Sequence, residues 1–251
     1  MSSSNTVFRF KQFAIWQDRT PMKVGTDGVL LGCIAQTSAD TQSTQPRILD
    51  IGAGTGLVSI MLAQRYATAT VTGVEIDPEA AGQATENCQA SPFATRLTIE
   101  QADIKTFVPA DGKAYDLIVS NPPYFTQSLQ CPDGRRNIAR HAVGLTFDDL
   151  TGAAARLLTP EGRVAIIIPH DAAASLEEAA ARAGLTLVAK TTIHSNRRKP
   201  PRRAVCQFER AERHPEGAPE AEKNELTLLN LDGTNTDEYQ ALSRDFYLDR
   251  H

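Results

Sequence analysis

The sequence lacks the features that mark several large protein classes. No apolar run approaches the roughly 20 residues of a membrane span, and residues 1–6 have neither the basic flank nor the apolar core of a signal peptide. Cys33, Cys88, Cys131 and Cys206 show no C-x-x-C spacing, and the five histidines do not pair with them. We therefore expect a cytoplasmic chain with reduced thiols and without a membrane segment, a disulfide framework or a metal site.

A strong positive charge is absent as well. The 251 residues carry a net charge of −4, which argues against a generally basic coat for nucleic acid but leaves room for a local basic patch. Hydrophobic residues make up 41% and charged residues 22%, as in ordinary globular proteins. One large domain with a substantial core is the expectation at this length.

What the sequence does have, from residue 46 onward, is an alternation of strand and helix patterns. This alternation predicts a mainly parallel sheet with helices on both faces, and a hairpin of the last two strands would make one edge antiparallel. Before residue 46 we expect a strand at 8–13 and a helix capped by Thr26 or Asp27. The later strands are predicted at 46–51, 71–74, 97–100, 115–120, 163–169, 185–188 and 204–209, and the helices at 29–35, 57–66, 78–90, 148–158 and 172–183.

A glycine-rich turn follows the first of these later strands. Residues 50–56 are D-I-G-A-G-T-G, and Leu57 stands where the dinucleotide fingerprint would have its third glycine. Glycines let the backbone turn tightly and approach a ligand closely. The segment predicts a ligand site, and a purely structural turn between strand and helix is the alternative.

Acidic residues follow three successive predicted strands, at Asp50, Glu75 and Asp103. Glu75 lies nineteen residues beyond Gly56, where a carboxylate is placed to bind the two hydroxyls of a ribose. Acids at these strand ends disfavour a phosphate-rich cofactor and favour a cationic one. S-adenosylmethionine fits, because it carries a ribose, an ammonium and a sulfonium.

The segment N-P-P-Y, residues 121–124, follows the strand predicted at 115–120. Two prolines stop that strand at the sheet edge where open α/β sheets bind ligands. The Asn121 side-chain carbonyl and the Pro122 backbone carbonyl can accept both hydrogens of one NH2 group, and Tyr124 can lie flat against the planar group that carries it. Such a nitrogen is a poor nucleophile, so alignment of its lone pair with a methyl donor is the main catalytic task.

Two basic clusters interrupt an otherwise acidic chain. Residues 135–141 (R-R-N-I-A-R-H) follow N-P-P-Y closely, and residues 196–203 (N-R-R-K-P-P-R-R) connect two late strands. Together they hold seven arginines and one lysine. The asymmetry favours a polyanion at the edge of the active site, and two solvated loops are the alternative.

The order D-x-G-x-G-x-G, Glu75, Asp103 and N-P-P-Y resembles the class I S-adenosylmethionine-dependent methyltransferases of the amino-methylating type, over about residues 46–170. The resemblance implies a Rossmann-like α/β fold, with a mostly parallel seven-stranded sheet, helices on both faces and an antiparallel edge strand. It also implies S-adenosyl-L-methionine as the cofactor.

Segments 10–13, 22–32, 135–140 and 245–248 further resemble the bacterial tRNA(Val) adenine-N6 methyltransferases, over nearly the whole chain. This resemblance implies methylation of the exocyclic N6 of an unpaired adenine in tRNA, at position 37 next to the anticodon. It also implies that the segment around 23–32 closes over the methionine end of the cofactor. We further expect a monomer that binds tRNA, without metal or membrane.

The predicted site residues form three sets. Asn121, Pro122 and Tyr124 orient the amine. Cofactor binding is assigned to Lys23, Thr26, Asp50, Gly52, Gly54, Gly56, Glu75, Ile76, Asp103, Ile104 and Asn121. RNA binding is assigned to Arg135, Arg136, Arg140, His141, Arg197, Arg198, Lys199, Arg202 and Arg203.

The chain is expected to divide into a segment at 1–45 that closes over the cofactor, a methyltransferase domain at 46–210, a flexible linker at 211–225 and a helical tail at 226–251 that packs on the domain. Other hypotheses use the same motifs. An N5-glutamine methyltransferase of release factors shares N-P-P-Y but normally carries a helical N-terminal domain. Another RNA or DNA adenine-N6 methyltransferase, a binding-only module and a nicotinamide dehydrogenase are the remaining alternatives, the last disfavoured by the glycine spacing.

Overall fold

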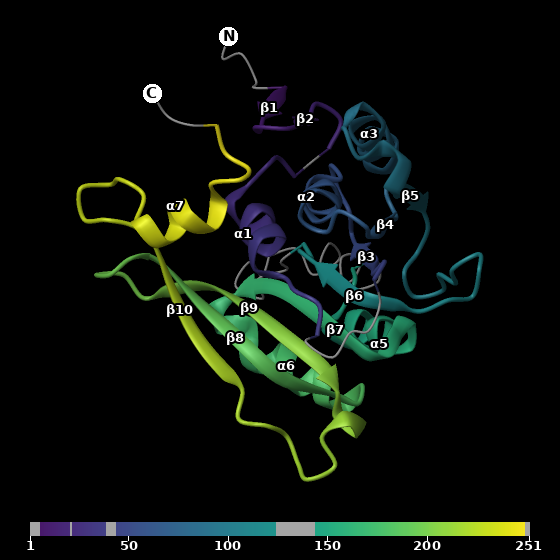
Figure 1. Ribbon diagram of the computed structural model, residues 1–251. Coiled ribbons are helices and arrows are strands. Elements are labelled where there is room, and N and C mark those ends of the chain that lie inside the picture. Colours follow the sequence, from purple (N-terminus) through teal and green to yellow (C-terminus); the bar gives the residue numbers. More distant parts are fainter. Residues whose placement is uncertain (1–5, 21, 39–43, 124–143, 249–251) are drawn as a thin grey trace, which may run out of the picture.

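A computed structural model describes residues 6–20, 22–38, 44–123 and 144–248 (Figure 1). Within them an eight-stranded sheet has the order β10-β8-β9-β7-β6-β3-β4-β5. Its strands are β3 (Arg47–Ile51), β4 (Thr70–Glu75), β5 (Leu97–Gln101), β6 (Tyr115–Ser120), β7 (Leu158–Pro169), β8 (Leu185–Asn196), β9 (Pro201–Arg210) and β10 (Glu222–Leu229).

The sheet is mainly parallel. Strands β3 to β7 pair in parallel, β9 runs antiparallel to both β7 and β8, and β10 pairs in parallel with β8. Strands β3, β4, β6 and β8 therefore end at the same edge of the sheet. The predicted α/β class with a mostly parallel sheet is confirmed.

Two details of the sheet differ from the prediction. It holds eight strands because residues 222–229 form β10, although 222–225 were expected in a linker and 226–229 in a helical tail. Leu226 of β10 is 4% exposed and joins the core, which the charged residues before it concealed. The antiparallel strand β9 lies inside the sheet and not at its edge.

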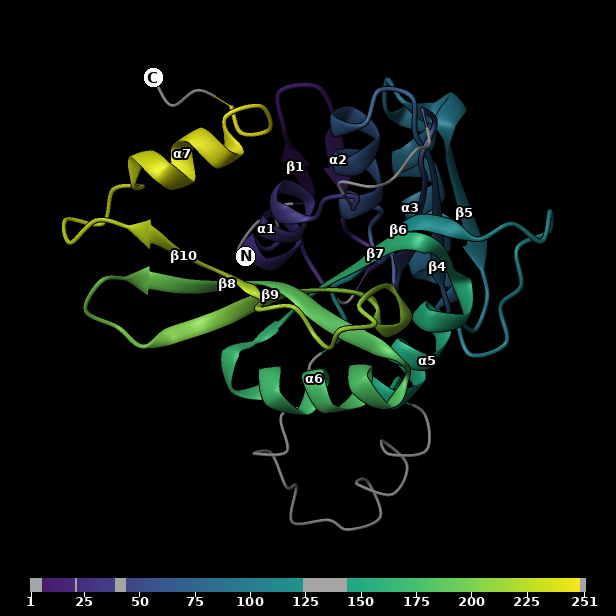
Figure 2. The ribbon, with the colours of Figure 1, turned by 60° about the horizontal axis from the view of Figure 1, so that its bottom comes forward.

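Helices cover both faces of the sheet (Figure 2). One face carries α1 (Thr26–Ile34) and α2 (Leu57–Arg65), with α3 (Pro78–Ala90) beside them, and the other carries α5 (Phe147–Leu157) and α6 (Ala173–Arg182). No helix in the described part of the chain combines the length and the apolar character that a membrane span requires.

The N-terminal segment departs from the single strand expected at 8–13. It forms a two-stranded antiparallel sheet of β1 (Val7–Arg9) and β2 (Ala14–Trp16), because the chain turns where the Phe10 amide donates to the Phe13 carbonyl at 2.8 Å. Both phenylalanines are buried. Helix α1 begins after Gly25 without a side-chain cap, so the cap expected at Thr26 or Asp27 was wrong.

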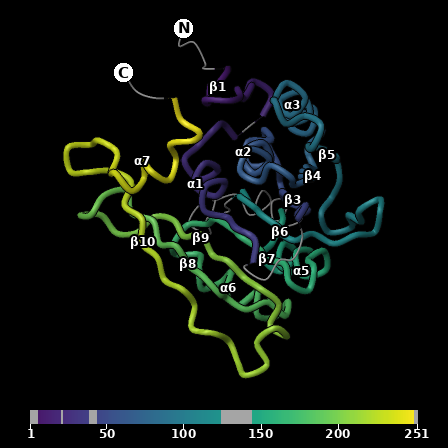
Figure 3. Tube along the Cα trace, viewed as in Figure 1, coloured from purple at the N-terminus to yellow at the C-terminus, as the bar shows by residue number. Residues whose placement is uncertain are grey.

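The C-terminal segment packs beside this hairpin (Figure 3). Helix α7 (Asp237–Ser243) buries Tyr239, and Phe246 after it is 2% exposed. The Tyr247 ring stacks on Phe10 with centroids 5.9 Å apart, and the Lys11 amide donates to the Phe246 carbonyl at 2.8 Å. The two end regions of the chain therefore stabilise each other.

Candidate active site

A cavity of about 420 Å³ opens at the edge where β3 and β6 end, and we call it the donor pocket. It is built from the segment before α1 and the first turn of that helix, the end of β3 with the glycine turn after it, the start of α2, the residue after β6 and one residue of β9. The lining residues are Met22, Lys23, Val24, Gly25, Thr26, Asp27, Gly28, Asp50, Gly52, Ala53, Gly54, Thr55, Leu57, Val58, Asn121 and Arg203.

The glycine turn has a backbone that other residues rarely adopt. Gly52, Gly54 and Gly56 have φ of +74°, +56° and +79°, and positive φ strains any residue with a Cβ atom. At Gly56 a Cβ atom would also meet the Cys88 sulfur at 3.3 Å. The three glycines are therefore required by the path of the chain, which exposes backbone along the floor of the donor pocket.

Glu75, at the end of β4, braces this turn. Its Oε2 accepts a hydrogen bond from the Gly54 amide at 2.9 Å, and its Oε1 accepts one from the Asp77 amide at 3.0 Å. A carboxylate offers about four lone-pair sites, so two hydroxyl donors can still be accommodated. Glu75 is not among the residues that line the donor pocket, and its contact with a ribose stays a prediction.

Asp50 is the buried acid of the donor pocket. Its side chain accepts a hydrogen bond from the Ser59 hydroxyl at 2.7 Å, and the residue is 2% exposed. Burial raises the pKa of Asp50 to about 6, the Ser59 hydrogen bonds oppose that rise and the charge of Glu75 adds to it. At neutral pH the carboxyl is mostly ionised, so the pocket offers a desolvated negative charge that suits a cation.

Asn121 lines the pocket after β6, near the starts of α1 and α2. Ser120 before it donates to the Ile51 carbonyl at 2.8 Å, which ties the end of β6 to the end of β3. A Cβ atom on Gly28 would stand 3.1 Å from Leu57 and 3.9 Å from the Asn121 amide nitrogen. Glycine at position 28 thus allows α1 to approach α2 beside the Asn121 side chain.

The segment that precedes α1 is held by hydrogen bonds to Gln17 and Thr20. The Lys23 ammonium donates to the carbonyls of Gln17 and Thr20, and the Val24 amide donates to the Gln17 side chain at 2.7 Å. Lys23 and Thr26 both line the pocket. Since the Lys23 charge is bound to carbonyls, its geometry favours a role in shaping this wall.

Arg203 is the one member of the second basic cluster that lines the donor pocket. Its Nε donates to Asp27 at 2.7 Å, with side-chain exposures of 29% and 24%. The pair connects β9 to the first turn of α1. The rest of that cluster, Arg197, Arg198, Lys199 and Arg202, is exposed on the β8–β9 hairpin at the same sheet edge.

Three predicted cofactor residues do not line the pocket. Ile76 is 61% exposed directly after Glu75, whereas Ile104 is 6% exposed and joins the core. Asp103 accepts the Lys105 amide at 2.9 Å. Their contacts with a cofactor stay predictions.

The structure brings Lys23, Thr26, Asp50, Gly52, Gly54 and Asn121 together around one cavity. Gly56, Glu75, Ile76, Asp103 and Ile104 lie outside its lining, and Pro122 is buried next to Asn121. Tyr124, Arg135, Arg136, Arg140 and His141 lie outside the described residues. Within the described ranges there is no cluster of three or more His, Cys, Asp or Glu that could hold a metal ion.

Sequence reasoning missed one residue that positions the turn. Asn87 of α3 is fully buried, and its amide donates to the Trp16 carbonyl at 2.8 Å and to the Thr55 carbonyl at 2.9 Å. It therefore links β2 to the glycine turn. The sequence did hold a signal for it, because Asn87 is a polar residue on the same helix face as Ala80, Ala84 and Cys88, which face the core.

Comparison with known proteins shows the family to which the chain belongs. The family model of the methyltransferase small domain matches residues 25–181. A relative from Phocaeicola vulgatus, 46% identical over 97% of this chain and 98% of its own length, is named tRNA1(Val) (adenine(37)-N6)-methyltransferase. A relative from Parabacteroides distasonis with the same name is 40% identical over 98% of this chain and 99% of its own length.

Solved structures show the same fold at low sequence identity. A predicted O-methyltransferase from Agrobacterium tumefaciens has a TM-score of 0.65 and 20% identity, over 88% of this chain and 96% of its own. A methyltransferase from Streptomyces caelestis has a TM-score of 0.53 and 17% identity, over 75% of this chain and 97% of its own. At such identities the likeness concerns the fold alone.

Proposed function

Because this chain belongs to the methyltransferase small-domain family, we propose that it methylates the exocyclic N6 of adenine 37 in tRNA1(Val), with S-adenosylmethionine as the methyl donor. The full-length relatives that carry this name support the substrate. The observation that carries the proposal is the presence of Asn121 and the buried Asp50 in one cavity beside the glycine turn.

The donor pocket fits S-adenosylmethionine, which supplies an electrophilic methyl group. A volume of about 420 Å³ lies within the range of small-molecule sites. Asp50 faces the pocket as a buried carboxylate that suits a positive charge. Gly52 and Gly54 present backbone without side chains, and Glu75 braces the turn while its remaining lone pairs accept ribose hydroxyls.

The amine is oriented by acceptors after β6. Asn121 Oδ1 and the Pro122 carbonyl accept its two hydrogens, so that its lone pair is directed into the donor pocket. Tyr124 stacks on the base and contributes roughly 1–3 kcal/mol. Extraction of the adenine costs a few kcal/mol and costs least in an unpaired loop, which suits a position next to the anticodon.

The β8–β9 hairpin holds the RNA. Arg197, Arg198, Lys199 and Arg202 are exposed at the sheet edge where Asn121 lies, and they bind phosphates of the anticodon arm, together with Arg135, Arg136, Arg140 and His141. Such contacts position the RNA without reading its bases. The enzyme works on tRNA in the cytoplasm, as a monomer.

The purified protein, S-adenosylmethionine and an unmodified tRNA1(Val) transcript provide the test. Nuclease digestion and mass spectrometry should detect N6-methyladenosine, and a transcript with guanine at position 37 should gain none. Methylation of a release factor and not of tRNA would favour the glutamine-N5 alternative and contradict the proposal.

A further inference from the structure

A second cavity, of about 540 Å³, lies at the opposite end of α2 from the donor pocket, and we call it the basic pocket. Leu57 and Val58 line the donor pocket at the start of the helix, and Gln64 and Arg65 line the basic pocket at its end. At 1.5 Å per residue the two linings are separated by about 10 Å along the helix. One bound molecule of RNA can therefore reach both.

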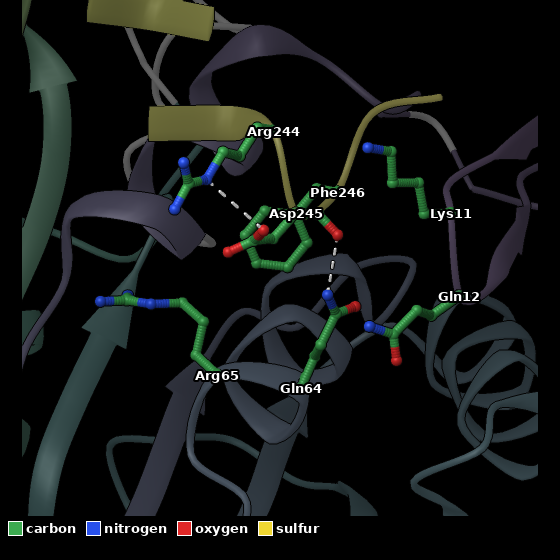
Figure 4. Close-up of a pocket in the computed structure, with 7 residues that line it drawn as sticks. All are labelled: Lys11, Gln12, Gln64, Arg65, Arg244, Asp245 and Phe246. Carbon is green, nitrogen blue, oxygen red and sulfur yellow. Dashed lines mark hydrogen bonds and ion pairs between the residues drawn. The ribbon is translucent and has the colours of Figure 1, made fainter. Parts of the chain in front are cut away.

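Three segments that are distant in sequence build the basic pocket (Figure 4). They are residues 11–12 between β1 and β2, residues 64–65 of α2 and residues 244–246 after α7. The Gln64 side-chain amide donates to the Asp245 carbonyl at 2.9 Å, and the Lys11 amide donates to the Phe246 carbonyl. The pocket is thus a fixed junction between the two end regions of the chain and the body of the molecule.

Positive charge dominates this junction. Lys11, Arg65 and Arg244 line it together with a single acid, Asp245, although the whole chain has a net charge of −4. Arg244 lies 3.8 Å from the Asp245 carboxylate, and the two side chains are 74% and 76% exposed. An ion pair that is so exposed to water neutralises the charge only weakly, so the pocket attracts an anion.

Hydrogen-bond donors remain for such an anion. Arg65 Nη1 donates to the carbonyls of Gly32 and Ala35 at 2.8 and 2.6 Å, which fixes its guanidinium at the end of α1. Among the described residues, no hydrogen bond engages the other Arg65 nitrogens or the Arg244 guanidinium. A guanidinium fork matches the geometry of a phosphate, and Arg65 is already held in place for it.

An acceptor in the pocket also lacks a partner. Gln64 Oε1 is buried and has no hydrogen bond within the described part of the chain. The amide cannot be flipped without bringing its oxygen against the Asp245 carbonyl, because its nitrogen donates there. A buried acceptor favours a donor group nearby. In Figure 4 the exposed side chain of Gln12, which lines the same pocket, lies beside Gln64.

We propose that the basic pocket binds a backbone phosphate of the same tRNA whose adenine enters the donor pocket. Arg65 and Arg244 hold the phosphate oxygens. The ribose next to that phosphate offers a hydroxyl donor as well. The inference rests on the proposed function for the identity of the RNA, but its test is binding and does not depend on turnover.

Arg244 is the residue to change, because it is exposed and no hydrogen bond among the described residues depends on it. The variants are Arg244→Gln and Arg244→Glu. Arg182→Gln is the matched control, since Arg182 is an exposed arginine, paired with Asp148 at 2.8 Å, on α6 on the other face of the sheet. Dissociation constants for tRNA and for S-adenosylmethionine are measured for each protein at several salt concentrations.

We expect Arg244→Gln to weaken tRNA binding by about threefold to tenfold and to reduce the slope of log Kd against log salt by about one. Arg244→Glu should weaken it further, and Arg182→Gln should behave as wild type. The dissociation constant for S-adenosylmethionine should stay the same in all four proteins, because the donor pocket is untouched.

An Arg244→Glu protein with the tRNA affinity and salt slope of the control would overturn the inference. A 5′-mononucleotide tested in parallel shows whether the pocket binds the phosphate of a free nucleotide and not that of tRNA. If it binds the wild type but not Arg244→Glu while tRNA affinity is unchanged, the pocket serves a free nucleotide and the assignment to tRNA is wrong. A wild-type protein that binds tRNA through Arg244 but does not methylate it would refute the proposed function alone.

Discussion

The two ends of helix α2 face cavities of different charge. At its start the donor pocket balances the acids Asp27 and Asp50 against Lys23 and Arg203, and at its end the basic pocket holds Lys11, Arg65 and Arg244 against the single acid Asp245. A cationic methyl donor and an anionic RNA thus have separate sites on one rigid element. The difference explains how an acidic chain can bind both without either excluding the other.

The two regions also differ in how they are built. The donor pocket depends on positive-φ glycines and on buried polar groups such as Asp50 and Asn87. The basic pocket depends on long side chains, of which Arg244 is largely exposed. Changes of Asn121 or Asp50 should therefore have larger effects than changes in the basic pocket or at the partly buried pair of Asp27 and Arg203.

The largest effect is expected from Asn121→Ala in the donor pocket. Loss of the acceptor that aligns the amine should lower kcat about 100-fold or more, while the dissociation constant for S-adenosylmethionine changes less than about threefold. Single-turnover kinetics and calorimetry give the two values. Asn224→Ala on the exposed strand β10 is the control, and equal losses of turnover and donor affinity would contradict the assigned role.

Asp50→Asn should weaken the binding of S-adenosylmethionine and at the same time stabilise the folded protein. Removal of the charge should raise the dissociation constant for S-adenosylmethionine about tenfold, as the loss of a charge-assisted contact does. The same change should raise the free energy of unfolding at pH 7 by roughly 1–3 kcal/mol, because the folded protein no longer buries a carboxylate. Calorimetry and denaturant unfolding measure both, and unchanged donor affinity would show that Asp50 does not face the cation.

The pH dependence of the donor pocket follows from the same residue. Burial raises the pKa of Asp50 from 3.8 to about 6, so its contribution to the stability of the ligand-free protein is complete below about pH 4 and is lost as the pH rises through 6. Donor binding has the opposite sign and should weaken about tenfold from pH 7 to pH 5, as the ionised fraction falls.

Titration of donor affinity against pH checks this expectation, and Asp50→Asn is its control. The substituted protein should lose the transition near pH 6. A transition that persists in Asp50→Asn would assign the titration to another group.

A smaller effect is expected from Glu75→Gln. A glutamine offers one oxygen where the carboxylate accepts both the Gly54 and Asp77 amides, so the free energy of unfolding should fall by about 1 kcal/mol. Donor affinity should fall about threefold to tenfold if the ribose also binds here. Lower stability with unchanged donor affinity would show that Glu75 stabilises the glycine turn but does not bind the ribose.

The smallest effect is expected at the wall that Asp27 and Arg203 share. A double-mutant cycle of Asp27→Ala and Arg203→Ala should give a coupling of about 0.5–1 kcal/mol in unfolding, because the pair is only partly buried. Donor affinity should fall about twofold to fivefold in each variant, as the first turn of α1 loosens. Purely additive effects would show that the ion pair does not fix this wall.

Much of the donor pocket could be predicted from the sequence because its residues are local to strand ends. Apolar strand patterns place Asp50 and Asn121 at one edge of a parallel sheet, and the glycine spacing marks the turn between them. The family and its methyl donor followed from these motifs, and both were confirmed.

The basic pocket could not be predicted in the same way. Lys11, Arg65 and Arg244 come from three distant segments, and no local pattern says that the C-terminal residues return to the N-terminal hairpin. The pairing of Arg203 with Asp27 escaped prediction for the same reason, since 176 residues separate them. Strand β10 was hidden by the charged residues at its exposed start.

The most direct test of the central claim is a crystal structure with sinefungin, an unreactive analogue of the methyl donor. The account predicts that the analogue lies over the glycine turn, with its ribose near Glu75 and the amine that replaces the methyl group directed towards Asn121. An analogue in the basic pocket, or one whose amine is directed away from Asn121, would contradict it.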